Sequence, residues 1–187
     1  MTKRDHDPCR LDVERFATEG GHVDGDWPLA SMTRLVASCD PARPPAETDG
    51  VRWSAHGERR RRDGGGLDAC LRLVLEAQVH LTCQRCLAPV ETTLGVDRWF
   101  RFVEGEQQAA DLDTDSDDDV LATTRALDLH ALAEDELLLA LPLVPRHVAC
   151  PQPLPAPGET SGGDPAEAPH ESAHPFAALA ALKRDRH

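Results

Sequence analysis

Aromatic side chains are scarce in this sequence: they make up 4% of its 187 residues, and tyrosine is absent. A hydrophobic core must therefore be built mainly from leucine, valine and alanine, within a hydrophobic content of 40% that is slightly below the usual share. The length fits one domain with some irregular sequence.

Long apolar runs are missing as well. No stretch approaches the roughly 18 residues that a membrane-spanning helix needs. The opening residues, MTKRDHDPCRLDVERF, carry early charges but no apolar segment behind them, so they do not read as a signal peptide. We therefore expect a cytoplasmic protein without a membrane partner. In that reducing compartment its six cysteines are expected to be thiols or metal ligands rather than disulfides.

Basic residues are outnumbered, with 20 Lys+Arg against 33 Asp+Glu and a net charge of −13. The tract 104–119 (EGEQQAADLDTDSDDD) contributes eight acids and no base. Such a self-repelling tract is typical of a solvated, disordered loop. The negative charge disfavours non-specific capture of nucleic acid, whose affinity comes from neutralised phosphates, but it allows local basic patches.

The strongest periodicity lies in residues 67–83, where every odd position is apolar or cysteine. This alternation predicts a half-buried strand. At about 3.3 Å per residue a straight strand would be too long for an ordinary sheet, so we expect a strongly bent strand or two strands in phase. Residues 51–55 and 90–103 also alternate as strands, whereas GGHVDGDWP (20–28) is expected to be a loop or short hairpin.

Two helices are predicted. One covers residues 28–37, because Pro28 suits a first helical turn. The other covers 129–141, with Asp128 as its N-cap and Pro142 after its end. We expect an α+β fold in which a bent, mostly antiparallel sheet, curved enough to become barrel-like, is packed by one or two helices. Its core should contain the odd residues of 67–83 together with Leu94, Phe100 and Leu137.

The chain is expected to divide into three parts. Residues 1–150 form a single α+β domain that includes the acidic loop 104–119. Residues 151–175 (PQPLPAPGETSGGDPAEAPHESAHP) are rich in proline, glycine and acids, which predicts a disordered linker. Residues 176–187 form a short apolar and basic tail.

Cys83 and Cys86 form a CxxC motif at the end of a predicted strand. Two thiolates with this spacing can chelate one tetrahedral zinc ion, and Cys150 and His147 could complete its four ligands. The alternative is that these thiols are idle and merely pack on a turn. A redox role is the weakest interpretation, because no thioredoxin-like pattern surrounds the motif. Zinc is the one cofactor that the sequence indicates.

We expect segments 81–90 and 134–150 to meet in space. The helix 129–141 must bury its leucine-rich side, and the sheet that carries Cys83 offers the only extensive apolar surface. Docking the helix there would bring residues 142–150 back towards the CxxC turn. Without a metal, this segment is still expected to pack there through Leu143 and Val144.

No catalytic constellation is evident. Consecutive helical residues point about 100° apart, so Glu134, Asp135 and Glu136 are expected to form a solvated face rather than an acid–base pair. The run 64–66 (GGG) lacks the context of a phosphate loop and predicts a hairpin turn. We therefore expect a protein that is not an enzyme and has no small-molecule substrate.

The candidates for RNA or partner contact are basic. A run of four arginines could grip an RNA backbone through its guanidinium groups, or form an exposed loop tip. Further bases lie in the CxxC turn, after the second helix and in the tail. The full set is Arg59, Arg60, Arg61, Arg62, Arg85, Arg146, Lys183 and Arg184.

Three segments resemble the YceD family of small bacterial cytosolic proteins: LTCQRCLAPV (81–90), EDELLLALPLVPRHVAC (134–150) and HPFAALAALKR (174–184). They occur in the order and near the spacing of that family, and the opening segment 11–38 is similar to its N-terminal region. The resemblance implies a non-enzymatic ribosome-biogenesis factor that supports accumulation of large-subunit (23S) ribosomal RNA. It implies no catalytic residue.

Two kinds of partner follow from this resemblance: large-subunit rRNA itself or a basic ribosomal protein. The acidic tract suits the basic protein, because complementary charge speeds encounter. The alternative function is a zinc-stabilised adaptor or scaffold that does not contact RNA. A metal- or thiol-dependent enzyme would need a nucleophile and base that the sequence lacks beyond its CxxC motif.

Overall fold

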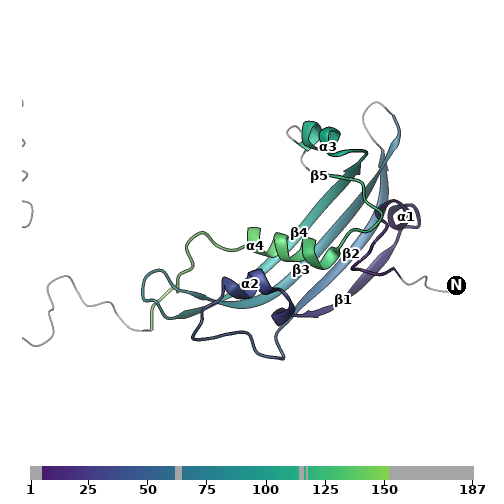
Figure 1. Cartoon of the computed structure of the whole chain (residues 1–187). Helices are drawn as coiled ribbons and strands as arrows, with labels where there is room; N and C mark the ends of the chain where they lie inside the picture. Colours follow the sequence, from purple (N-terminus) through teal and green to yellow (C-terminus); the bar gives the residue numbers. More distant parts are fainter. Residues whose placement is uncertain (1–5, 62–64, 114–115, 117, 152–187) are drawn as a thin grey trace, which may run out of the picture. The chain divides into compact units, whose positions relative to one another are not determined.

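The structure, a computed structural model, describes residues 6–61, 65–113, 116 and 118–151. These residues form a mixed five-stranded sheet in the order β1-β2-β3-β4-β5 (Figure 1). The strands are β1 His22–Pro28, β2 Gly50–Arg61, β3 Leu67–Thr82, β4 Pro89–Val103 and β5 Asp119–Ala122. Neighbouring strands are antiparallel except β4 and β5, which are parallel.

The α+β class is confirmed, but the barrel-like sheet is wrong. Strands β1 and β5 are the two ends of the strand order, so the sheet is open rather than closed on itself. β5 has only four residues and pairs with one end of β4. Such a short edge strand leaves most of the outer edge of β4 without a strand on which closure could be built.

The two-residue period of 67–83 is confirmed as one continuous strand, β3, that ends one residue before Cys83. Its odd positions from Ala69 onwards are buried, and Arg72 and Glu76 between them are exposed. Leu67 is the exception, with 52% of its surface exposed. It pairs with Arg61 at the last rung of the β2–β3 ladder, where the strands run out beyond the main core.

Four α-helices lie among the described residues, where one or two were expected. They are α1 Val13–Thr18, α2 Thr33–Ala37, α3 Glu106–Asp113 and α4 Leu129–Leu139. Figure 1 shows α2 and α4 lying together across one face of the sheet. α4 buries Leu129, Ala133 and Leu137, which are four residues apart and so share one face. Its predicted N-cap is confirmed, because the Asp128 carboxylate accepts bonds from the backbone N–H groups of the next turn.

The single helix predicted for 28–37 is wrong. Pro28 ends β1, a 3₁₀ turn covers Leu29–Ser31, and α2 begins only at Thr33. The residue before α2, Met32, has no side chain that can cap it. Instead, Glu134 of α4 accepts hydrogen bonds from the backbone N–H groups of Arg34 and Leu35, at 2.7 and 3.2 Å. A cap from a distant helix leaves no signal in the local sequence.

Residues 134–136 are therefore not the solvated face that was expected. Glu134 and Glu136 are buried, and only Asp135 is exposed. Burial alone would raise the pKa of Glu134, but the N–H groups of α2 and the Arg34 guanidinium outweigh it and lower that pKa. Glu136 lacks such a cap, so burial raises its pKa, although Arg98 at 3.8 Å partly opposes the shift.

Residues 22–28, predicted as part of a loop or short hairpin, form strand β1 and pair with β2. Trp27 of β1 stacks on Trp53 of β2, with ring centroids 4.3 Å apart. Gly25 permits this packing, because a Cβ there would lie 3.3 Å from the Trp53 ring. The local sequence reads as a turn, and only the long partner strand β2 converts it into an edge strand.

The disordered loop predicted at 104–119 is also wrong where the structure describes it. Residues 106–113 form α3, and β5 begins at Asp119. A small second core explains this order: Ala109 of α3 packs with Val103 and Val120, and Leu112 lies partly buried beside them. The sequence-based prediction considered only the acids of this tract. It overlooked Ala109 and Leu112, whose spacing of three residues places them on one side of a helix.

Several expectations lie outside the described residues. They are the linker 151–175 apart from Pro151, the tail 176–187, Arg62, Lys183 and Arg184. Within the described part of the chain, no helix has the length and apolar character needed to cross a membrane.

Candidate metal centre

The CxxC motif lies in the turn that joins β3 to β4. The Cys83 N–H donates to the Ala88 carbonyl at 3.0 Å, and the Leu87 N–H donates to the Cys83 carbonyl at 2.9 Å. These bonds close a tight turn over residues 83–88, so that the side chains of Cys83 and Cys86 can approach one another.

After α4 the chain returns to this turn, as the sequence predicts. The backbone N–H of Gln84 donates to the Pro145 carbonyl at 2.9 Å, which ties the segment 142–150 (the return segment) to the turn. The predicted contact through Leu143 and Val144 is wrong, because both side chains are exposed. Backbone groups and the Cys and His side chains join the two segments instead.

Four potential ligand atoms converge where the segments meet. The ligand atoms of Cys83, Cys86, His147 and Cys150 all lie within 4.8 Å of one another. The Sγ atoms of Cys83 and Cys150 are 4.0 Å apart, and Cys86 Sγ lies 3.4 Å from His147 Nδ1. Ligands of a tetrahedral zinc ion with Zn–S bonds near 2.3 Å lie about 3.8 Å apart, so this Cys3His set fits zinc in number, chemistry and spacing.

The orientation of His147 suits a ligand role. Its Nε2 atom lies 3.0 Å from the Pro89 carbonyl, which can only accept a hydrogen bond. Nε2 must therefore carry the proton in the neutral ring, leaving the lone pair on Nδ1, the atom that faces Cys86. A backbone carbonyl that fixes the tautomer in this way is the usual second partner of a metal-binding histidine.

The cluster stabilises the thiolate of Cys83 but not that of Cys86: the backbone N–H of Ala88 lowers the pKa of Cys86, but burial and the neighbouring sulfurs of Cys150 and Cys83 outweigh it and raise that pKa. Burial raises the pKa of Cys83, but the backbone N–H groups of Cys86, His147 and Arg85 turned towards its sulfur outweigh burial and lower the pKa to about 5. The Arg85 guanidinium donates to Cys150 Sγ at 2.9 Å and to the His147 carbonyl at 3.2 Å. Since metal ligands must be deprotonated, these donors favour metal binding at neutral pH.

Asp40 supports this end of the sheet, and the sequence analysis missed it. Its buried carboxylate accepts from Thr82 Oγ1 at 2.7 Å, and its backbone N–H donates to the His80 carbonyl, also at 2.7 Å. These bonds hold residue 40 against the last residues of β3, directly before Cys83. In the sequence Asp40 precedes a proline in an irregular segment and looks like any turn aspartate.

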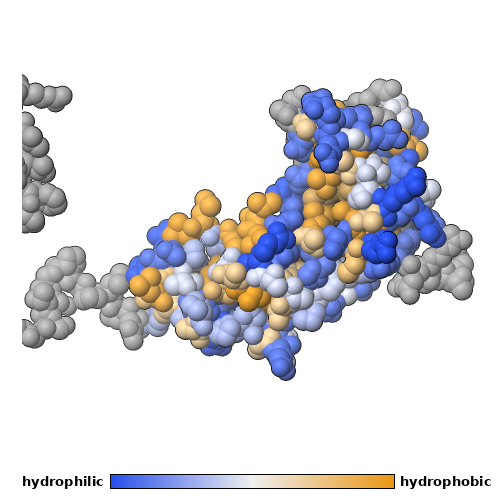
Figure 2. Space-filling model, in the orientation of Figure 1, coloured by the Kyte–Doolittle hydropathy of each residue, from blue (hydrophilic) through white to orange (hydrophobic). Residues whose placement is uncertain are grey.

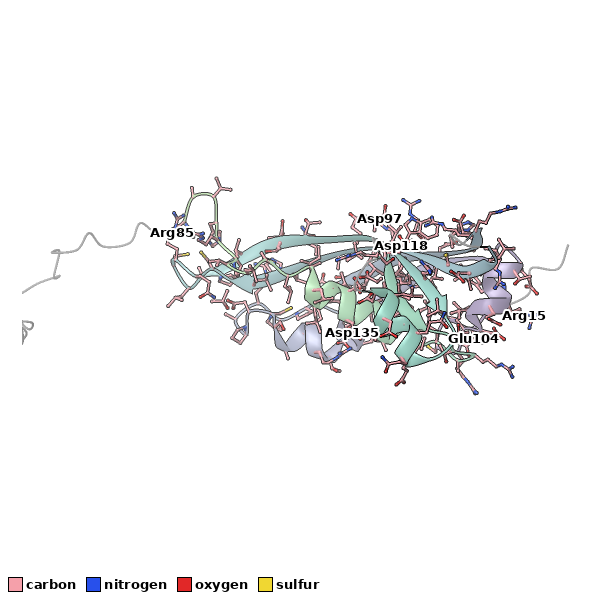
Figure 3. All side chains as sticks on the ribbon, turned by 90° about the horizontal axis from the view of Figure 1, so that it is seen from above. Arg15, Arg85, Asp97, Glu104, Asp118 and Asp135 are labelled. Atoms are coloured by element: carbon pink, nitrogen blue, oxygen red, sulfur yellow. The ribbon has the colours of Figure 1, made fainter. Side chains whose placement is uncertain are left out.

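The basic residues predicted for RNA or partner contact do not form one surface. Arg59 and Arg61 are exposed near one end of β2, whereas Arg85 and Arg146 lie with the cysteines at the other end of the sheet. Roughly 40 Å of strand separates the two groups, at about 3.3 Å per residue. Figure 3 shows Arg85 at the end of the sheet opposite Arg15 and Glu104.

Arg60 is already engaged within the protein. Its guanidinium pairs with Glu58 and with Asp118, and it lies 3.4 Å from the centroid of the Trp99 ring. A phosphate would have to displace these partners, so Arg60 is a poorer candidate than its neighbours for RNA contact.

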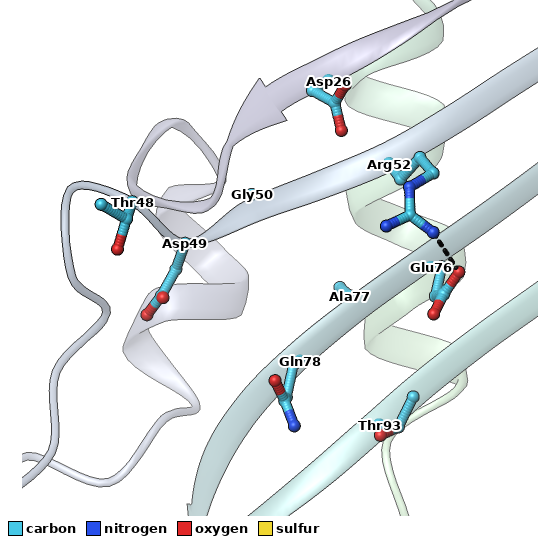
Figure 4. Close-up of a pocket in the computed structure, with 9 residues that line it drawn as sticks. All are labelled: Asp26, Thr48, Asp49, Gly50, Arg52, Glu76, Ala77, Gln78 and Thr93. Carbon is cyan, nitrogen blue, oxygen red and sulfur yellow. Dashed lines mark hydrogen bonds and ion pairs between the residues drawn. The ribbon is translucent and has the colours of Figure 1, made fainter.

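A groove of about 520 Å³ lies on the sheet between the ends of β1 and β4 (Figure 4). Its lining is polar, and Arg52 within it pairs with Glu76 at 2.8 Å. Within the described residues, its lining contains no cysteine, serine or histidine, so it lacks the thiol, serine hydroxyl and imidazole that usually form a nucleophile–base pair. The Cys3His cluster is therefore the better-defined candidate site.

Together the open sheet and the cluster define a small α+β domain whose strand end carries a zinc-type ligand set. Residues 71–183 match the family described as "Large ribosomal RNA subunit accumulation protein YceD", and the chain belongs to this family. A protein of that name from Haemophilus influenzae is 36% identical over 110 residues, which cover 59% of this chain and 63% of that protein. No solved structure matches the chain.

Proposed function

We propose that this protein supports the accumulation of large-subunit ribosomal RNA as a cytoplasmic, non-enzymatic ribosome-biogenesis factor. The observation that carries the proposal is membership of the family whose description names that role.

The proposal includes a zinc ion held by Cys83, Cys86, His147 and Cys150. When bound, zinc would supply a crosslink between the β3–β4 turn and the return segment. The three thiols and the imidazole leave no ligand position of a tetrahedral ion open, so the site is structural rather than catalytic.

The partner is large-subunit rRNA or a basic ribosomal protein. For RNA, the available guanidinium groups are those of Arg59 and Arg61 at one end of the sheet and of Arg146 at the other. For a basic protein, the complementary surface is α3 and the acids around it, because the tract 104–119 holds eight acids and no base.

Deletion of the gene in its own host tests the function. The ratio of large- to small-subunit rRNA should fall and should be restored by the wild-type chain. The same rRNA ratio is then compared for two variants. One is the double variant Arg59→Glu with Arg61→Glu, and the other is the control Glu14→Gln, which changes another exposed residue at that end of the sheet. An unchanged rRNA ratio in the deletion strain would refute the proposal.

Crosslinking with ultraviolet light in the same cells distinguishes the two partners. Direct RNA contact predicts recovery of large-subunit rRNA fragments with the wild-type chain and a clear loss with the double arginine variant. Action through a ribosomal protein predicts no RNA fragments although the rRNA ratio still depends on the protein.

A further inference from the structure

Large apolar side chains are exposed on the CxxC turn, on the return segment and at the end of α4 that leads into it. Six large hydrophobic side chains are exposed within the described residues, and only Leu67 among them lies at the far end of β3. The other five are Leu87 at 73%, Leu139 at 74%, Leu143 at 101%, Val144 at 50% and Val148 at 104% exposure. We call these five the apolar patch. Figure 2 shows hydrophobic atoms standing out from the surface over this part of the molecule.

The patch is built from segments that are bonded to one another. Leu87 follows Cys86 and Val148 follows His147, and the facing side-chain atoms of Cys86 and His147 are 3.4 Å apart. Val144 directly precedes Pro145, whose carbonyl is bonded to the CxxC turn. Exposed apolar side chains held together in this way mark an interaction site more often than isolated ones do.

The backbone of Leu87 gives an independent indication. Its φ of 61° places it in the left-handed region, and it is the only non-glycine residue with positive φ within the described part of the chain. Glycine adopts this conformation without strain, whereas a leucine does so at a cost. The exposed side chain recovers little of that cost by burial in this chain. Strain retained without a packing gain points to a function of the side chain.

The patch also differs in charge from the rest of the chain. Residues 77–90 and 137–151 contain no acid, although the chain carries a net charge of −13. The same segments contain Arg85 and the exposed Arg146. A surface with this character attracts carboxylates and repels bases, so a basic ribosomal protein is a poor occupant.

Its chemistry favours a protein over RNA or a membrane. The five side chains are aliphatic, so they offer no ring on which a base could stack. Two arginines neutralise few phosphates. Residues 142–150 have irregular backbone, whose polar groups would lose their water in a lipid interior.

We propose that the apolar patch is a docking site for a partner protein segment that carries apolar side chains flanked by carboxylates. This goes beyond the role in rRNA accumulation and names a partner of different chemistry from rRNA or a basic ribosomal protein.

The first test places the photocrosslinking residue benzoylphenylalanine at position 143 or 148 of the full chain in living cells, with position 67 as the control. We expect a protein adduct from the first two positions and not from the third. Mass spectrometry of the crosslinked peptide should show apolar residues and more acids than bases. A crosslink to RNA, lipid, a second copy or a basic peptide would overturn the proposal, as would no adduct.

The second test measures the dissociation constant for the crosslinked protein after its purification. Leu143→Ser and Val148→Ser should each weaken binding about tenfold, as do large side chains in docking sites, while Leu67→Ser leaves it unchanged. Arg146→Glu should weaken binding in a salt-dependent manner. Equal losses for all of these variants, including Leu67→Ser, would overturn the proposal.

Leu87→Gly separates docking from stability. Glycine relieves the left-handed strain, so the variant should melt at a higher temperature than the wild type and still bind its partner about tenfold more weakly. Unchanged affinity in a stabilised Leu87→Gly variant would show that Leu87 has no docking role.

Discussion

The two ends of the β3–β4 hairpin are finished in different ways. At the cysteine end, residues 83–88 and the return segment are joined by converging polar ligands and backbone hydrogen bonds. At the acidic end, α3 and β5 rest on a small core of Val103, Ala109 and Val120, supplemented by ion pairs. Where strands extend beyond the main core, their ends need other contacts to hold them in place. One end uses backbone hydrogen bonds and a cluster of three cysteines and a histidine that could hold a metal, and the other uses a few apolar contacts.

Removal of the metal ligands should have the largest effect on this comparison. Cys83→Ser should abolish the zinc that we expect at about one ion per chain, and it should lower the melting temperature. At free zinc a thousandfold above its Kd, a bound ion adds about 4 kcal/mol to stability. Elemental analysis and thermal unfolding measure both effects. Cys9→Ser, an exposed cysteine outside the cluster, is the control. A wild-type chain that melts identically before and after chelation would contradict the ligand-based closure.

The next largest effect is the difference in unfolding free energy between a substitution in the main core and one in the small core of the acidic end. Leu137→Ala removes a fully buried side chain and should reduce the free energy of unfolding by about 3 kcal/mol. Leu112→Ala, in α3, should reduce it by about 1 kcal/mol, because that side chain is only partly buried. Urea titrations measure these differences, with the exposed Leu139→Ala as the control. Equal losses at Leu112 and Leu137 would show that α3 belongs to the main core.

Glu134 and Glu136 of α4 predict opposite pH effects. The pKa of Glu134 is lowered by folding, so its contribution to stability is present above the ordinary glutamate pKa, about 4.3, and is lost as the pH falls through the lower folded value. Glu134→Gln should therefore cost about 2 kcal/mol at pH 7 and less in acid.

The pKa of Glu136 is raised by folding, so the wild type loses stability as the pH rises from the ordinary value through the raised one. Glu136→Gln should be more stable than wild type at pH 7 and equal to it in acid. Thermal unfolding from pH 3 to pH 8 checks both signs. The same direction of change for both variants at pH 7 would refute the assignment.

The smallest effect concerns the ion pairs of the acidic end. Asp118→Asn removes the pair with Arg60, which is partly exposed, so the loss should be below about 1 kcal/mol. Salt screens such pairs, because the Debye length shortens as the ionic strength rises. The difference in stability should therefore shrink as the salt concentration is raised from about 0.05 M to about 1 M. A larger, salt-independent loss would indicate that Asp118 has a role in packing instead.

The local pattern was sufficient where one segment provides its own evidence. The alternation in β3 identified its buried face, and Asp128 identified the start of α4. The CxxC motif together with His147 and Cys150 was sufficient to predict which side chains would meet. The pattern failed where the partner was distant, as with the capping of α2 by Glu134 and the pairing of β1 with β2.

Sequence alone therefore determined the strand phase, the α4 helix and the meeting of three cysteines with one histidine, because periodicity, capping and the CxxC motif are properties of short segments. Only the tertiary structure decided that the sheet is open, that an acid-rich segment folds as α3, and that Glu136 is buried whereas Leu143 is exposed. The physical reason is that burial depends on what other segments cover a residue. The polarity of a side chain favours burial or exposure, but the packing of the rest of the chain determines which of the two occurs.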